Sequence, residues 1–170
     1  MNTEHAIAKK ILIEADAATV WQVLTDAAYI VDWLGVHVLS DWNVGSPLVF
    51  LFDGSGRPFS DKSTILKLDS EKMFSYSFWS EVSGLPDRPE NYSVITFWLI
   101  NKGEATALIL NHDHLPMKTM VEHVAKHWEQ TLMTIKGLAE GKRARALRKG
   151  PARVQKSNTP HQQSGEQSHA

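Results

Sequence analysis

The stretch 7–34 constrains the fold more than any other part of the chain. Residues 7–14 place isoleucine at most alternate positions, which predicts a strand with one buried face. Asp16 follows, and an aspartate here can accept hydrogen bonds from the free N–H groups of a first helical turn. Residues 17–25 then have helical spacing, and 27–34 predict a second short helix. We therefore expect one strand followed directly by two short helices.

The middle of the chain changes to the two-residue period of strands. The alternating runs are 48–52, 64–68, 74–78, 92–100 and 106–114. Asp53-Gly54-Ser55-Gly56 and Asn101-Lys102-Gly103-Glu104 have turn composition. Strands joined by such short connections predict an antiparallel meander.

A long helix closes the globular part of the chain. Its apolar residues recur at steps of three and four, which gives a stripe wide enough to lie across a sheet. The stripe is Val121, Val124, Trp128, Leu132, Ile135 and Leu138. Gly141 is a plausible helix end, with 142–149 as a weak extension. The whole order predicts an α+β fold, with a curved antiparallel sheet of about six or seven strands wrapped around the last helix.

Composition and charge divide the chain into a domain and a tail. The 170 residues, 42% of them hydrophobic, suit one domain, which we assign to residues 1–141. That part is acidic, whereas residues 142–170 are first basic and then polar and are expected to be disordered. Cysteine is absent, so the chain cannot form disulfides or thiolate metal sites. Without a signal-peptide pattern or a long apolar run, we expect a cytoplasmic protein without a membrane partner.

The basic tail permits two interpretations. The segment KRARALRKGPARVQK carries seven basic residues and no acidic one, so it could contact phosphates or an acidic partner. It contains no aromatic residue on which a base could stack, and we do not expect nucleic-acid binding. A solvated tail without a partner is the simpler interpretation.

Several segments together resemble a known family. They are the opening strand, Val20-Trp21…Leu24-Thr25-Asp26, Trp33-Leu34-Gly35, Val44-Gly45, Asp53-Gly54, Thr106…Leu108…Leu110…His112 and Trp128…Leu132…Ile135-Lys136…Leu138…Glu140. In order and spacing they resemble the START-like, birch-pollen-allergen-like (SRPBCC) superfamily, and within it the family named after the activator of the heat-shock-protein-90 ATPase. The resemblance covers roughly residues 6–141. It implies a helix-grip fold around a cavity, in a superfamily that contains carriers, cyclases and co-chaperones.

The inward faces of the predicted elements supply a candidate ligand site. The candidate ligand-binding residues are Trp33, Leu48, Phe50, Tyr76, Phe78, Leu110, His112 and Trp128. Apolar walls with few polar groups are typical of small-molecule pockets. The same residues could instead simply fill the core.

His112 is the one candidate with acid–base chemistry. It shares a strand face with Leu108 and Leu110, where it could orient a ligand or act as a general base. Alternatively, it is a core-edge histidine bonded to a backbone carbonyl. Together with His114, His123 and His127 it forms a histidine-rich region, but helical geometry turns His123 toward solvent. We therefore expect no metal site and no cofactor.

Three classes of function remain open. The first is non-catalytic binding of a hydrophobic or amphipathic small molecule between sheet and last helix. The second is a co-chaperone-like protein interaction module, and the third is a cyclase- or dehydratase-like enzyme using the same cavity. We regard an enzyme as the weakest, because phosphate-binding and nucleophile-elbow motifs are absent from the sequence. Val49, Leu51 and Ile109 are apolar on the opposite strand face, which favours a homodimer as an additional hypothesis.

Overall fold

The computed structural model describes residues 5–52, 57–58 and 60–149. In these residues the α-helices and strands are β1 (Ile7–Ile13), α1 (Ala17–Thr25), α2 (Ala27–Leu34), β2 (His37–Leu39), β3 (Val49–Phe52), β4 (Arg57–Pro58), β5 (Ile65–Asp69), β6 (Met73–Phe78), β7 (Ser93–Asn101), β8 (Thr106–Asp113) and α3 (Thr119–Lys149), and two short 3-10 helices, η2 (Glu81–Ser83) and η3 (Pro89–Asn91), lie between β6 and β7. The Asp53–Gly56 turn expected from the sequence and residues 150–170 of the tail lie outside the described residues.

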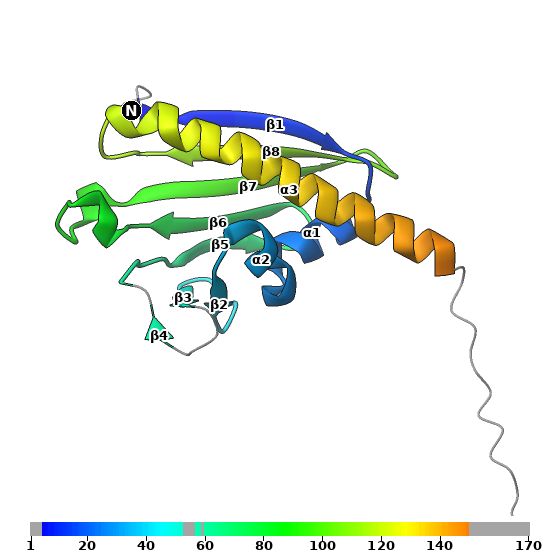
Figure 1. Ribbon diagram of the computed structural model, residues 1–170, viewed down its shortest axis with the longest axis horizontal. Helices are drawn as coiled ribbons and strands as arrows, with labels where there is room; N and C mark the ends of the chain where they lie inside the picture. Colours follow the sequence, from blue (N-terminus) through cyan, green and yellow to red (C-terminus); the bar gives the residue numbers. More distant parts are fainter. Residues whose placement is uncertain (1–4, 53–56, 59, 150–170) are drawn as a thin grey trace, which may run out of the picture.

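Five strands form the main sheet in the order β1-β8-β7-β6-β5, and all neighbours are antiparallel. A second sheet has the order β2-β3-β4, and a bridge from Pro47 to Thr64 joins it to the region before β5. The long helix α3 crosses the face of the main sheet, with α1 and α2 beside it (Figure 1). The predicted α+β helix-grip fold is therefore confirmed.

The strand count differs from the expectation of six or seven strands in one sheet. The described residues hold eight strands in two sheets. The additional strands include β2, with three residues, and β4, with two. A segment this short cannot display a two-residue period, so alternation does not reveal it.

The two short helices share one residue at their junction. Asp16 caps α1 as expected, because its Oδ1 accepts a hydrogen bond from Thr19 N at 2.9 Å. Asp26 then ends α1, where its N–H donates to Gln22 O (2.9 Å), and begins α2, where its Oδ1 accepts from Ala28 N (2.9 Å). Gly35 ends α2 with φ 82°, a conformation in which a side chain would be strained.

Replacing Asp26 by alanine is expected to lower the free energy of unfolding by about 1 kcal/mol, because the first turn of α2 loses its cap. Urea denaturation measures the difference. Asp32→Ala is the matched control, since Asp32 lies exposed within the same helix. Equal stabilities of the two variants would contradict the capping role.

The core lies between α1, the main sheet and the second half of α3. Its fully buried side chains include Val20 and Leu24 on α1, Phe97 and Leu108 on the sheet, and Ile135 on α3. The stripe predicted for the last helix is thus tightly packed in its C-terminal half. Its N-terminal half covers the other end of the sheet.

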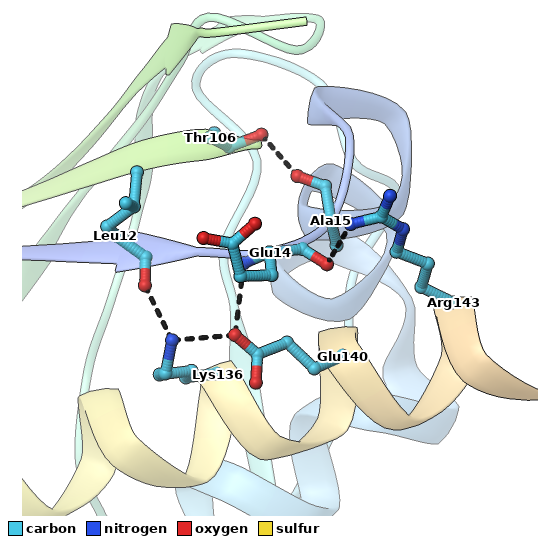
Figure 2. A network of polar contacts seen from close by, with 7 residues as sticks. All are labelled: Leu12, Glu14, Ala15, Thr106, Lys136, Glu140 and Arg143. Carbon is cyan, nitrogen blue, oxygen red and sulfur yellow. Dashed lines mark hydrogen bonds and ion pairs between the residues drawn. The ribbon is translucent and has the colours of Figure 1, made fainter. Parts of the chain in front are cut away.

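Polar contacts fix α3 against the end of β1 (Figure 2). Lys136 Nζ donates to Leu12 O at 2.7 Å and pairs with Glu140 at 2.6 Å. Glu140 in turn accepts from the N–H of Glu14 at 3.0 Å, and the Lys136 ammonium holds the pKa of the Glu140 carboxyl below its usual value. Arg143 Nη1 donates to Glu14 O at 2.9 Å one turn later.

The helix does not end at Gly141, where a helix end was expected, but continues to Lys149. The Arg143 contact and the position of Lys142 Nζ, 5.7 Å from the centre of the Tyr29 ring, attach this extension to the rest of the fold. Alanine and arginine also favour helix in the segment 142–149. Local turn signals at Gly141 are therefore outweighed by tertiary contacts.

Candidate ligand-binding pocket

A pocket of about 260 Å³ lies between the N-terminal half of α3 and the main sheet, and we call it the helix–sheet pocket. On the sheet side and in the segment before β5 its wall is formed by Phe50, Asp61, Tyr76, Phe78, Ile95 and His112. On the helix side, and at and just after the end of α2, it is formed by Leu34, Val36, Val124, His127, Trp128 and Thr131. Larger hollows beside the end of α3 lie among Lys142, Arg143 and Arg145, on the surface of the molecule.

Aromatic rings form much of the pocket wall. Phe50 on β3 and Phe78 on β6 meet edge to face, with ring centres 6.0 Å apart. Trp128 enters from α3 and meets Phe97 of the core edge to face at 5.8 Å. Aromatic rings can contact another ring either face to face with an offset or edge to face, so this wall suits a flat apolar ligand.

A buried hydrogen-bond chain joins α3 to the sheet beside the pocket. The Trp128 indole Nε1–H donates to His112 Nδ1 at 2.9 Å, and His112 Nε2 lies 2.8 Å from Ser93 Oγ. Because an indole N–H can only donate, Nδ1 of His112 is the acceptor, and in the neutral ring Nε2 carries the proton. Burial lowers the pKa of His112 to about 4, which keeps the ring neutral at pH 7.

This chain limits what His112 can do. Both ring nitrogens are bonded to protein groups, so the ring presents to the pocket no unpaired nitrogen that could accept a proton. The partners are an indole and a hydroxyl, where a backbone carbonyl was the expected alternative. The geometry therefore favours a structural role for His112 over the general base that an enzyme of this type would need.

The predicted site residues fall into three places. Phe50, Tyr76, Phe78, His112 and Trp128 line the helix–sheet pocket. Trp33 and Leu48 line a neighbouring space of about 10 Å³, where the Trp33 indole donates to Val23 O at 2.8 Å. Leu110 is fully buried in the core and belongs to neither wall.

Sequence reasoning did not assign several wall residues to the site. Val124 and Thr131 lie four residues before and three after Trp128, so helical spacing alone could have indicated them. Ile95 pairs with Tyr76 across the sheet, which only the strand register reveals. Asp61 lies in an irregular segment and accepts from Ser80 Oγ at 2.7 Å, and no sequence signal marks it.

The four neighbouring histidines have separate surroundings. His112 is buried, whereas His114, His123 and His127 are exposed, and of these three only His127 borders the helix–sheet pocket. Within the described ranges, no three His, Cys, Asp or Glu side chains come close enough together to hold a metal ion.

Comparison with known proteins identifies the family. The sequence profile described as Activator of Hsp90 ATPase homolog 1-like protein matches residues 14–140. The chain belongs to this family. The matched range spans α1 through most of α3, and thus includes every residue of the helix–sheet pocket wall.

Solved structures of this fold agree with that assignment. ChR145 from Cytophaga hutchinsonii is 30% identical, with a TM-score of 0.69 over 82% of this chain and 96% of that one. The Aha1 dimer from Colwellia psychrerythraea is 23% identical, with a TM-score of 0.62 over 79% and 96%. CalU16 from Micromonospora echinospora is 22% identical, with a TM-score of 0.63 over 82% and 79%. No match was found among curated proteins.

None of the helices in residues 5–52, 57–58 and 60–149 combines the length and the apolar character needed to cross a bilayer.

Proposed function

We propose that this protein binds a small apolar or amphipathic molecule in the helix–sheet pocket without transforming it. The observation that carries the proposal is a pocket of about 260 Å³ beneath α3 whose wall is mainly aromatic and aliphatic. Transfer of apolar ligand surface from water into such a wall yields roughly 25 cal/mol per Å². The engagement of both His112 nitrogens further supports binding over catalysis.

The test uses N-phenyl-1-naphthylamine, an uncharged probe whose fluorescence rises in apolar surroundings. We expect saturable binding in the micromolar range, and native mass spectrometry of the freshly purified protein to detect any co-purifying molecule. Val124→Phe should weaken probe binding about tenfold or more, because the larger side chain occupies the space beside Trp128.

Val82→Phe is the matched control, since Val82 is 94% exposed and is not part of the helix–sheet pocket wall. Circular dichroism should show both variants folded. If Val124→Phe binds the probe as tightly as the wild type, the site of binding lies elsewhere and the proposal is wrong.

A protein interaction surface is the second candidate. Leu12, Trp98 and Ile100 are each 40–50% exposed on the face of the main sheet turned away from α3. The register brings this surface together, because Ala107 pairs with both Leu12 and Ile100. We propose that a second copy of the chain covers it, by analogy with the dimer described for the Colwellia psychrerythraea protein.

Sedimentation equilibrium tests this second proposal. A dimer at tens of micromolar that becomes a monomer in Trp98→Lys would support it, and a wild-type monomer at that concentration would contradict it. A chaperone as a protein partner, and a cytoplasmic location, stay predictions from the sequence. Stimulation of a heat-shock-protein-90 ATPase by the purified protein would test the chaperone alternative.

A further inference from the structure

The pocket wall contains few polar groups that a ligand could use. Trp128 and His112 are bonded to each other, and His112 is also bonded to Ser93. On the helix side, Thr131 Oγ1 and His127 Nε2 lie 3.4 Å apart, a long contact. The remaining polar groups of the wall are the Tyr76 hydroxyl and the Asp61 carboxylate.

Tyr76 stands out among these groups. Its side chain is only 4% exposed, and its ring packs against Phe74 with centres 5.1 Å apart. The structure shows no hydrogen bond from its hydroxyl to any other described residue. A buried phenol without a partner among the described residues keeps little of its hydrogen bonding to water in the empty protein, and an acceptor on a ligand would restore it.

The hydroxyl of Tyr76 has access to open space. In the described part of the chain, Ser63 Oγ is the one side-chain oxygen or nitrogen that is inaccessible to solvent and also lacks a hydrogen-bond partner. The Tyr76 oxygen bonds to none of the described residues and is not in this class, so we infer that it is accessible. Tyr76 borders two spaces, but the smaller one exposes apolar atoms alone. The hydroxyl therefore opens on the helix–sheet pocket.

The protonation state of Tyr76 defines what the group can recognise. Burial raises the pKa of its hydroxyl far above the usual value near 10, so the group keeps its proton at every physiological pH. A protonated phenol that has no partner in the described part of the chain can donate its hydrogen bond to an acceptor on the ligand.

The charged residues of the pocket wall favour uncharged ligands over anionic ones. Among the residues that form its wall there is no lysine or arginine, and Asp61 contributes a carboxylate. An anionic ligand would bury its charge next to that carboxylate, and no lysine or arginine of the wall would compensate it, which is unfavourable. An uncharged ligand incurs no such penalty.

From these observations we propose that the ligand is an uncharged aromatic molecule bearing a carbonyl-type acceptor, which accepts a hydrogen bond from the Tyr76 hydroxyl. This inference rests on the proposed binding function. The aromatic part lies against the Phe50, Phe78 and Trp128 rings, and the acceptor faces the sheet. Carboxylic acids of the same shape are excluded by charge.

The experiment compares three naphthalenes of matched shape as competitors of N-phenyl-1-naphthylamine. They are 2-acetylnaphthalene, which carries the acceptor, 2-ethylnaphthalene, which lacks it, and 2-naphthoate, which is anionic. Each is measured with the wild type, with Tyr76→Phe and with Tyr92→Phe. Tyr92 is the matched control, because its hydroxyl donates to Asp87 at 2.6 Å and it is not part of the pocket wall.

The decisive quantity is the ratio of the Kd values for the ethyl and acetyl compounds. We expect Tyr76→Phe to reduce this ratio about tenfold, the effect of losing one buried hydrogen bond, and Tyr92→Phe to leave it within twofold. We also expect Tyr76→Phe to be at least as stable as the wild type, because the lost hydroxyl bonds to none of the described residues. The naphthoate should bind the wild type at least tenfold more weakly than the ketone.

The outcomes separate the two proposals. Probe binding with an unchanged ratio in Tyr76→Phe, or with naphthoate binding as tightly as the ketone, would overturn the inference and leave the binding function intact. Absence of probe binding to the wild type would overturn both.

Discussion

Replacing Trp128 by alanine should lower the free energy of unfolding by about 3–5 kcal/mol, the largest effect we expect from a single substitution. Trp128 is 4% exposed and contacts Phe97 and His112 edge to face. Alanine removes these contacts, opens a void beside the existing pocket and leaves His112 Nδ1 without its donor. Urea denaturation followed by circular dichroism measures the loss.

A second substitution separates packing from hydrogen bonding. Trp128→Phe keeps a ring but removes the indole N–H, so its cost of about 1–3 kcal/mol measures the unpaired His112 nitrogen and a smaller void. Trp98→Ala is the control for tryptophan loss as such, because Trp98 is 41% exposed on the outer sheet face. If Trp128→Ala costs no more than Trp98→Ala, Trp128 is not the residue that fixes α3 to the sheet.

Acidification should destabilise the protein through His112. The unfolded chain binds a proton at the ordinary histidine pKa near 6.5, whereas the folded protein binds it only near 4. Since the unfolded state binds more protons between these values, stability is fully present above about pH 6.5 and is lost as the pH falls toward 4. The shift corresponds to about 3 kcal/mol at the acidic end.

The measurement is the free energy of unfolding against pH for the wild type and for His112→Gln. An amide can still accept from the Trp128 indole and does not titrate, so the variant should lose less stability between pH 6.5 and 4. His123→Gln is the matched control, because His123 lies exposed on α3. Carboxyl groups whose pKa is lowered, such as those of Asp16 and Glu140, also reduce the free energy of unfolding as the pH falls. Because they are present in all three proteins, their contribution cancels when the profiles are compared.

A pH profile that is the same for His112→Gln and the wild type would show that the His112 ring is protonated as readily in the folded protein as in the unfolded chain. That result would contradict the buried hydrogen-bond chain. In this comparison His123→Gln is expected to behave like the wild type. If His123→Gln retained more stability than His112→Gln between pH 6.5 and 4, the result would also contradict the buried hydrogen-bond chain.

The order of the elements could be predicted from the sequence because it depends on local patterns. The cap at Asp16, the alternation along β7 and β8, and the stripe that contains Trp128 each arise from residues within a few positions of one another. Each pattern records which side of an element is apolar, and burial in the folded protein follows that side.

Local patterns do not record which side chains of different elements meet. Whether His112 finds a backbone carbonyl or an indole depends on where α3 crosses β8. Ser93 reaches the same ring because the two strands pair in one particular register. The position of Asp61 in the pocket wall and the continuation of α3 beyond Gly141 likewise depend on contacts between distant segments.

The sequence by itself therefore determined the types, the order and the apolar faces of the longer elements, because these follow from short-range periodicity and capping. The tertiary structure decided that a pocket remains beneath the first half of α3, that His112 is bonded on both sides, and that the Tyr76 hydroxyl opens on that pocket. The physical reason is that free volume and hydrogen-bond partners are set by how the curved sheet and the crossing helix fit together, and no segment of the chain specifies that fit alone.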